Sequence, residues 1–247
     1  MIKTFIFFDL ETTGLITKNY MPKITEMSLI AVSRAAISNT KDNLPRVTQK
    51  LVLPIHPNEP VTKEIQTLTG LSNENLKEAQ YFNCEVYNLI VNFINRQTAP
   101  SCFVAYNGNN YDYPIFLSEL KNIEKNFSEE ILSIDMLKLV KDFYSRKQSS
   151  TKGMNTVQTT TTNPSSNENK KGYTVRRKLD FTNSQPINFK LGSIYKHIFG
   201  KTLEGAHSAE NDCLTMIRCA IKLGNFFLEW TDCNAIPLIN HTKQRNI

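Results

Sequence analysis

The chain has 247 residues, 40% hydrophobic and 21% charged, which is enough for one large domain with the composition of an ordinary soluble protein. No apolar run approaches the roughly 20 residues that a membrane-spanning helix needs, and no secretory signal is visible. The five cysteines form no C-x-x-C pair, which argues against a zinc ribbon or a disulfide framework. We therefore expect a cytoplasmic or nuclear protein with no membrane partner.

Strands are predicted in both halves of the chain. Lys3–Phe8 is a β-rich apolar run that leads into an acidic motif, and Thr25–Ala35 and Arg46–Leu53 predict the next two strands. Ser101–Ala105 predicts a short buried strand. Ser133–Tyr144 predicts a strand followed directly by a helix.

The remaining periodic segments predict helices, because their apolar residues recur at three- and four-residue spacings. The predicted helices are Thr62–Thr69 (ended by Gly70), Ser72–Leu76, Tyr81–Arg96, Tyr113–Lys121, Leu191–Phe199 and a long closing helix at Ala209–Leu228. These elements predict an α/β fold with a mixed central sheet flanked by helices. We expect one domain made of residues 1–144 and 188–235, with residues 236–247 as a C-terminal tail.

The positive charge is concentrated in one segment. The formal net charge is +6, and residues 145–178 hold eight basic side chains and one acidic one. Of the 22 residues from Gln148 to Asn169, 16 are Ser, Thr, Asn or Gln, and such a stretch buries too little apolar surface to fold. We expect residues 145–187 to form a flexible basic insertion. It suits a polyanionic partner, and the alternative is a solvated segment with no partner.

Carboxylates stand in three separate motifs. Asp9 and Glu11 are two residues apart on the first strand, so their side chains point to the same face, although D-x-E alone is common by chance. Asp112 follows the strand at 101–105, and its alternative role is a helix N-cap. Asp212 lies on the apolar stripe of the closing helix, where a carboxylate is costly unless it is paired or binds a metal.

These carboxylates together predict a site for two divalent metal ions, because such ions relieve the repulsion among gathered carboxylates. The expected ligands of two Mg²⁺ ions, or of Mn²⁺ in their place, are Asp9, Glu11, Asp112 and Asp212. His207, at the entry to the closing helix, is expected to act as general base. Such a set suits phosphodiester hydrolysis, with one ion activating a water molecule and the other stabilising the leaving 3′ oxygen.

The three motifs resemble those of a known enzyme family. The segments DLETTGL (9–15), NGNNYDYP (107–114) and HSAEND (207–212) are similar to the exonuclease motifs of the DEDDh (DnaQ-like) 3′→5′ exonucleases, the last of which is H-x-A-x-x-D. The flanking segments KITEMSLIAV, LTGLS, FINRQ and KLGSIYKHIFG narrow the resemblance to the three-prime repair exonucleases, the TREX group, over residues 4–143 and 188–233. The resemblance implies an RNase H-like, DnaQ-like exonuclease fold.

The same resemblance implies roles for further residues. It makes Thr12, Leu15, Leu68 and Tyr111 contacts to the terminal nucleotides, with the two leucines as wedges between the last two bases. Ordinary core leucines are the alternative. The family is dimeric, so the resemblance implies a homodimer in which Arg96 lies near the subunit interface and the third strand pairs across it.

A DNA-holding role is implied for the basic insertion. The positions concerned are Lys170, Lys171, Arg176, Arg177 and Lys178. The second motif departs from the family, since it has Tyr106 and Asn109-Asn110 where relatives commonly carry a histidine and charged residues.

The sequence thus predicts a metal-dependent 3′→5′ DNA exonuclease that releases 5′-mononucleotides. Its expected substrates are single-stranded DNA and the 3′ ends of double-stranded DNA, because one end must be unpaired to reach a buried metal site. One alternative is an RNA-trimming DEDDh exonuclease, for which the 2′-hydroxyl is the discriminating group. Another is a nucleic-acid-binding module without catalysis.

Overall fold

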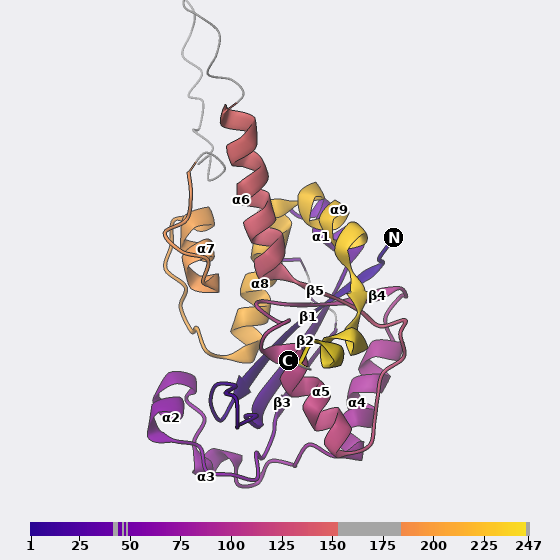
Figure 1. Cartoon of the computed structure of the whole chain (residues 1–247), viewed down its shortest axis with the longest axis vertical. Coiled ribbons are helices and arrows are strands. Elements are labelled where there is room, and N and C mark those ends of the chain that lie inside the picture. The colour runs from indigo at the N-terminus through magenta and orange to yellow at the C-terminus, as the bar shows by residue number, and fades with distance from the viewer. Residues whose placement is uncertain (42–43, 46, 48, 153–183, 246–247) are drawn as a thin grey trace, which may run out of the picture.

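A mixed six-stranded sheet forms the centre of the molecule (Figure 1). The computed structural model describes residues 1–41, 44–45, 47, 49–152 and 184–245. Within them the strands stand in the order β3-β2-β1-β4-β5-β6, and β1 pairs antiparallel with β2 and parallel with β4. This confirms the predicted mixed α/β sheet. The strands are β1 Thr4–Thr12, β2 Ile24–Ser33, β3 Gln49–Pro54, β4 Ser101–Ala105, β5 Leu132–Asp135 and β6 Ile236–Pro237.

Helices pack on both faces of this sheet (Figure 1). One hydrophobic cluster joins the sheet to α1, α6, α7, α8 and α9, and the other joins it to α4 and α5. In the part of the chain that the structure describes, no helix is both long and apolar enough to cross a membrane. The helices are α1 Arg34–Asn39, α2 Lys63–Thr69, α3 Asn73–Leu76, α4 Cys84–Asn95, α5 Asp112–Asn122, α6 Met136–Lys152, α7 Leu191–Phe199, α8 Ala209–Leu223, α9 Asn225–Asn234 and the 3₁₀ helix η1 Leu238–Arg245.

Strand β1 separates the two clusters through the alternation of its side chains. Phe5 and Phe7 belong to the cluster that α8 covers, whereas Phe8 belongs to the cluster under α4 and α5. Successive side chains of a strand point to opposite faces. Asp9 and Glu11 are therefore directed to the face that α8 covers.

Several predicted elements match the structure closely. β4 and α7 have the predicted bounds. α2 begins after Thr62, whose hydroxyl accepts a hydrogen bond from the N–H of Ile65, and it ends at Gly70, which has the left-handed φ of 75°. Both ends follow from local chemistry, because threonine is a good N-cap and glycine adopts a left-handed conformation without steric cost.

The prediction of one long closing helix is wrong. Helix α8 ends at Leu223, and α9 starts after Gly224, which has a φ of 55°. The apolar spacing continues through the glycine, so the pattern alone does not reveal the change of direction. A hydrogen bond of 2.8 Å from Trp230 Nε1 to Asp142 Oδ2 then ties α9 to α6.

The predicted bounds of several other elements are also corrected. The second strand stops at Ser33, because the Ser33 hydroxyl accepts a hydrogen bond from the N–H of Ala36 and begins α1, which was not predicted. α4 starts at Cys84 rather than at Tyr81, since Asn83 caps it. β3 begins at Gln49, and residues 46 and 48 of the predicted third strand lie outside the described residues.

The predicted insertion and tail are partly corrected as well. α6 continues to Lys152, so the first residues of the 145–187 segment are helical, while residues 153–183 lie outside the described residues. The predicted tail returns to the sheet, because Ile236 pairs with Ser133 and Leu238 is fully buried. Isolated short strands such as β6 carry little periodicity, which is why the sequence did not reveal this one.

His241 anchors the C-terminal return. Its side chain is buried, its Nε2 lies 2.8 Å from the Ser133 hydroxyl, and its ring stacks on Tyr113 with 4.7 Å between ring centroids. Burial lowers the pKa of His241 to about 4, and the charge of Lys138 acts in the same direction. The fold therefore requires a neutral imidazole at this position.

This requirement predicts a pH-dependent contribution to stability. A histidine in the unfolded chain has a pKa of about 6.5, so the contribution of His241 is complete above that pH and is lost as pH falls towards the folded pKa. His241→Phe keeps an aromatic ring on Tyr113 but does not titrate. We expect the difference in unfolding free energy between wild type and this variant to change by about 2 kcal/mol, to the disadvantage of wild type, between pH 7 and pH 5. Urea denaturation at both pH values measures it, and a difference that is independent of pH would contradict the prediction.

Candidate functional site

Three carboxylates meet where β1 passes under α8. Asp9 and Glu11 come from β1 and Asp212 from the first turn of α8, and one oxygen of each lies within 4.8 Å of the others. Glu11 is buried, and the other two are half-buried. The structure thus brings together three of the four predicted metal-binding carboxylates in one group.

Asp112 stands beside this group without being part of it. It is the first residue of α5 and is 2% exposed, and its Oδ1 accepts a hydrogen bond of 3.2 Å from the backbone N–H of Leu10. The N-cap alternative is wrong, because the helix starts at Asp112 and Tyr111 occupies the capping position. The Asp112 carboxylate nevertheless raises the pKa of Asp9 and of Glu11, so its charge acts on the group.

Burial raises the pKa of all four carboxyls, and like charge adds to the rise at Asp9, Glu11 and Asp112. Burial, followed by the charges of Asp212 and Glu26, raises the pKa of Glu11 to about 8. Burial likewise raises the pKa of Asp112 to about 7, against the opposing hydrogen bond from Leu10. Burial and the neighbouring carboxylates raise the pKa of Asp9 well above its usual value. Such a concentration of hard oxygen donors, with raised pKa values, fits a divalent cation.

His207 lies in the loop that leads into α8. Its backbone has a φ of 66°, in the left-handed region, and its side chain is exposed. Burial raises the pKa of Asp212, and His207 opposes this through the charge of its ring and through its backbone N–H. The amide Nδ2 of Asn211 donates a 3.0 Å hydrogen bond to the carbonyl of Gly205 and so ties this loop to the start of α8.

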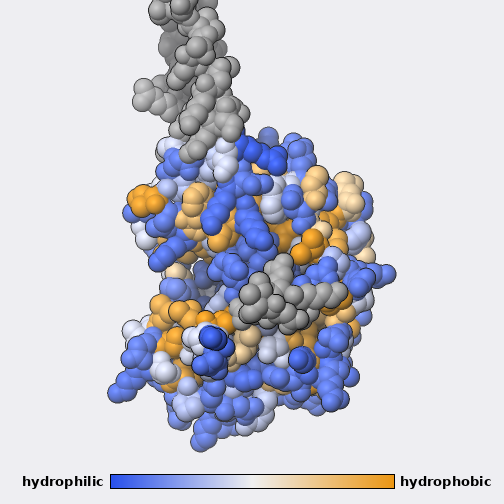
Figure 2. All heavy atoms as spheres, in the orientation of Figure 1, coloured by the Kyte–Doolittle hydropathy of each residue, from blue (hydrophilic) through white to orange (hydrophobic). Residues whose placement is uncertain are grey.

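The predicted substrate contacts fall into two kinds. Leu15 and Leu68 are 74% and 49% exposed, so the alternative that they are core leucines is wrong. Thr12 is buried, its hydroxyl contacts that of Tyr111, and the Tyr111 hydroxyl donates a 2.8 Å hydrogen bond to the carbonyl of Gly14. Figure 2 shows apolar side chains gathered on the lower left of one face, among mostly hydrophilic ones.

The remaining predicted residues are at the periphery or outside the described chain. Arg96 is exposed at the end of α4. β3, the strand predicted to pair across a dimer, is an edge strand of the sheet. The five basic positions predicted to hold DNA lie outside the described residues; they are Lys170, Lys171, Arg176, Arg177 and Lys178.

Asp135 is one residue that the sequence reasoning missed. It ends β5 and is 3% exposed. Its Oδ1 accepts 2.9 Å hydrogen bonds from the N–H groups of Asn107 and Leu137, and its Oδ2 accepts one of 3.3 Å from Asn109. Asp135 therefore holds the turn that leads to Asp112. An acidic residue in an apolar strand was the available signal, since such a residue needs partners.

Glu26 was missed in the same way. It stands alone as an acid within the apolar strand β2, directly opposite Glu11. Its Oε2 accepts a 2.8 Å hydrogen bond from the backbone N–H of Ala209, the first residue of α8.

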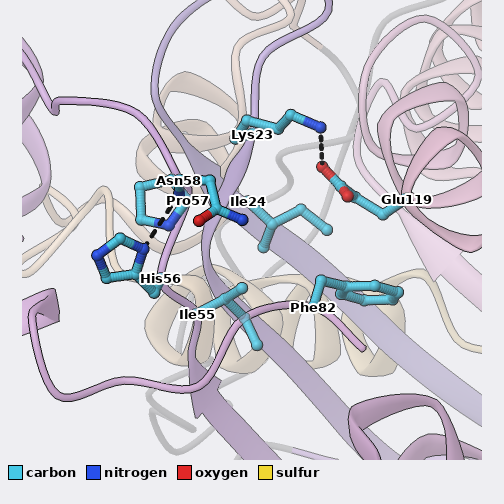
Figure 3. Close-up of a pocket in the computed structure, with 8 residues that line it drawn as sticks. All are labelled: Lys23, Ile24, Ile55, His56, Pro57, Asn58, Phe82 and Glu119. Carbon is cyan, nitrogen blue, oxygen red and sulfur yellow. Dashed lines mark hydrogen bonds and ion pairs between the residues drawn. The ribbon is translucent and has the colours of Figure 1, made fainter. Parts of the chain in front are cut away.

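A small cavity has none of the clustered carboxylates in its lining (Figure 3). Its volume is about 40 Å³, and Lys23 and Glu119 form an ion pair of 3.1 Å at its rim, with Ile24, Ile55 and Phe82 as apolar lining. None of the predicted site residues lines it. We assign it no part in the site.

Comparison with known sequences gives a consistent picture. The family model described as Exonuclease (RNase_T) matches residues 6–163. The mouse (Mus musculus) protein named Three prime repair exonuclease 2 is 29% identical over 238 residues, which cover 93% of this chain and 87% of that protein.

Solved structures share the fold at low sequence identity. The nuclease domain of 3′hExo, described as a DEDDh family member bound to rAMP, has a TM-score of 0.60 at 12% identity and covers 90% of this chain and 92% of its own. Exonuclease I of E. coli in complex with a dT13 oligonucleotide has a TM-score of 0.63 at 14% identity, covering 94% of this chain and 43% of its own. These likenesses support the predicted RNase H-like exonuclease fold.

The raised carboxyl pKa values predict how the metal-free protein responds to pH. Because the folded pKa of Glu11 lies near 8 and the unfolded value lies near 4.5, the folded state binds the proton more tightly, so the metal-free protein gains stability as pH falls between these values. Glu11→Gln removes this carboxylate. In EDTA at pH 8 we expect the variant to exceed wild type by at least about 1 kcal/mol in unfolding free energy. We expect the gap to close by pH 5.

Chemical denaturation in EDTA at the two pH values measures this effect. A divalent cation should stabilise wild type more than Glu11→Gln, since the variant lacks one of the three clustered carboxylates. Glu85→Gln, which changes an exposed acid on α4, is the control. A Glu11→Gln protein that is less stable than wild type at pH 8 in EDTA would contradict the repulsion argument.

Proposed function

Because the chain belongs to the exonuclease family and is similar to the three prime repair exonucleases, we propose that it hydrolyses DNA from the 3′ end and releases 5′-mononucleotides. The observation that carries the proposal is the group formed by Asp9, Glu11 and Asp212, with oxygens within 4.8 Å of one another and Asp112 beside it. Phosphodiester hydrolysis places negative charge on oxygens that neutral surroundings stabilise poorly. A carboxylate cluster of this kind serves it by holding cations.

Two Mg²⁺ ions are the proposed cofactors, with Mn²⁺ able to replace them. Asp9, Glu11 and Asp212 would hold them, with Asp112 completing the set. When bound in such a site, a pair of divalent ions activates the attacking water and stabilises the leaving oxygen. Glu11 and Asp112 are buried, so their charges interact more strongly than they would in solution.

His207 is the proposed general base. Imidazole takes up and releases a proton near neutral pH, which suits it to accept the proton of the attacking water. The exposed position of His207, five residues before Asp212 and in the loop that leads into the same helix, supports this role. The exposed side chain is free to approach a substrate that covers the carboxylates.

Exposed apolar side chains support the proposed recognition of unpaired 3′ ends. Leu15 follows the acidic motif by four residues, and Leu68 lies on α2. Large exposed leucines suit contacts with bases that have left their stack, so we propose that both contact the terminal nucleotides together with Thr12 and Tyr111. A preference for single-stranded or frayed ends follows, because a paired end would not expose its bases to these side chains.

The first test uses substitutions in the site. A 5′-labelled single-stranded DNA oligonucleotide in Mg²⁺ should be shortened stepwise from its 3′ end, and EDTA should stop the reaction. Asp212→Ala should abolish activity, and His207→Ala should lower kcat by about 10²- to 10⁴-fold, the usual contribution of a general base. His56→Ala, at a histidine that is not among the proposed site residues, is the control and should retain wild-type activity. Full activity in Asp212→Ala would overturn the mechanism.

RNA trimming is the second candidate function. It is favoured by one structural neighbour, the nuclease domain that is bound to rAMP, whereas the Exonuclease I structure with dT13 favours DNA. We expect DNA to be hydrolysed faster than RNA of the same sequence, as measured by kcat/KM on matched oligonucleotides in the reaction above. Faster RNA hydrolysis would replace the proposed substrate, and salt-dependent binding without any turnover would favour a binding module.

Assembly gives a separate prediction. β3 is an edge strand with one row of backbone groups unpaired within the sheet, and such edges pair with another strand or are protected. We propose a homodimer through β3, with Arg96 near the interface. Light scattering should give twice the chain mass of 28.3 kDa for wild type, and Arg96→Glu should shift the protein towards the monomer. A monomeric wild type at micromolar concentration would refute this arrangement.

A further inference from the structure

The start of α8 lacks the cap that its sequence offers. Ser208 occupies the N-cap position, and serine is among the favoured capping residues, but its side chain makes no capping hydrogen bond. Instead, the backbone N–H of Ala209 donates a 2.8 Å hydrogen bond to Glu26 Oε2 of β2. A residue from the sheet therefore caps the helix.

This bond satisfies a group that has no access to water. Ala209 is fully buried, so without Glu26 its N–H would be a buried donor with no partner. A carboxylate at a helix N-terminus also interacts favourably with the partial positive charge there. Hydrogen bonds to an ionised acceptor are stronger than those between neutral groups.

The position of Glu26 is unfavourable for the sheet itself. Glu26 stands directly opposite Glu11 in the antiparallel pair of β1 and β2, and like charges in opposite positions destabilise a sheet. Its charge also raises the pKa of Asp9 and Glu11. A glutamate here adds to the repulsion at the site, and its bond to α8 is the compensating contact.

The first turn of α8 has other links, and they are weaker. Glu210 forms an ion pair with Lys50 of β3, but the Lys50 side chain is 57% exposed, and exposed pairs contribute little. The Asn211 side chain donates to the carbonyl of Gly205, in the loop of the same segment. Within the described chain, Glu26 provides the charge-assisted, shielded bond between this turn and the sheet.

From this geometry we infer that Glu26 is a positioning residue: it fixes the first turn of α8, and with it Asp212, relative to Asp9 and Glu11. Asp212 lies one turn into the helix from Ala209, and its N–H bonds to the Ser208 carbonyl, so a shift of the helix start moves its carboxylate. Asp9 and Glu11 are fixed separately in β1. The spacing of the three oxygens thus depends on the bond between β2 and α8.

This inference rests on the proposed function for its meaning, since it assigns Glu26 to the assembly of the metal site. Residues that orient metal ligands typically change metal affinity by about 10- to 100-fold when they are removed. Glu26 would act through Asp212, so its loss should weaken metal binding before it affects the chemical step.

The experiment compares Glu26→Ala with Glu26→Gln. The glutamine amide oxygen can accept the same N–H without a charge, whereas alanine cannot. Mn²⁺ binding by titration calorimetry and the Mg²⁺ concentration for half-maximal DNA hydrolysis are both measured. In Glu26→Ala we expect both constants to rise by about 10-fold or more, with kcat at saturating Mg²⁺ largely retained. In Glu26→Gln we expect them to stay within about threefold of wild type.

Glu210→Gln is the matched control, because it removes a half-buried acid from the same helical turn and should leave both constants unchanged. Equal metal affinity in wild type and Glu26→Ala would overturn the inference. Equally weak binding in both Glu26 variants would overturn it too, because the charge of Glu26 rather than its hydrogen bond would then matter. Should Glu26→Ala fail to fold by circular dichroism, Glu26→Asp takes its place, since its shorter side chain keeps the charge without the reach and should bind metal as weakly.

The two hypotheses fail in distinguishable ways. A wild-type protein that binds Mn²⁺ but digests no DNA would refute the proposed function, and the calorimetric comparison of Glu26 variants would still decide the positioning role. A wild type that digests DNA, with Glu26→Ala unchanged in metal affinity, would refute the positioning role alone.

Discussion

The repulsion among carboxylates at the end of β1 is the constraint on which the site depends. Asp9, Glu11, Asp112 and Asp212 are drawn from three elements and placed where water is scarce, and the pKa of each is raised. Gathering such groups lowers the stability of the fold in the metal-free state. Other interactions in the structure must offset this loss. The large apolar clusters on the two faces of the sheet do so, and they also hold the chain elements that approach the site.

The topology explains how residues distant in sequence meet. β1 is a central strand whose two faces are covered by the two apolar clusters. It pairs with β2 as far as Thr12 but with β4 only from Thr4 to Phe7, so the part that carries Asp9 and Glu11 has β2 alone as its strand partner. Its odd-numbered side chains face α8, which brings Asp212, while α5 from the other side of the sheet brings Asp112 to the N–H of Leu10. Asp135 holds the turn before Asp112, as Glu26 holds the start of α8. Asp135 and Glu26 are not proposed metal ligands, but each supports the position of one, Asp112 and Asp212 respectively.

The sequence predicted most of this site because motif residues carry local signals. The alternation on β1 places Asp9 and Glu11 together, and the apolar stripe of α8 makes Asp212 conspicuous. What it did not predict depends on tertiary contacts: Glu26 and Asp135 are recognisable as supports only when their partners in other segments are known. The break at Gly224, the short helix α1 and the return of the chain at Ile236 were missed for a related reason. Single caps and two-residue strands leave almost no pattern in the sequence, whereas α7 has an apolar stripe and β4 is a continuous buried run.

The left-handed backbone of His207 has an evolutionary consequence. A non-glycine residue in that region costs about 1–3 kcal/mol, and glycine relieves most of that cost. Replacement of His207 by glycine would therefore relax the loop while deleting the imidazole. Under the proposed role of His207 as general base, the change would raise stability and lower activity at the same position. Selection for heat resistance alone would therefore favour glycine at this position, at the expense of the proposed general base.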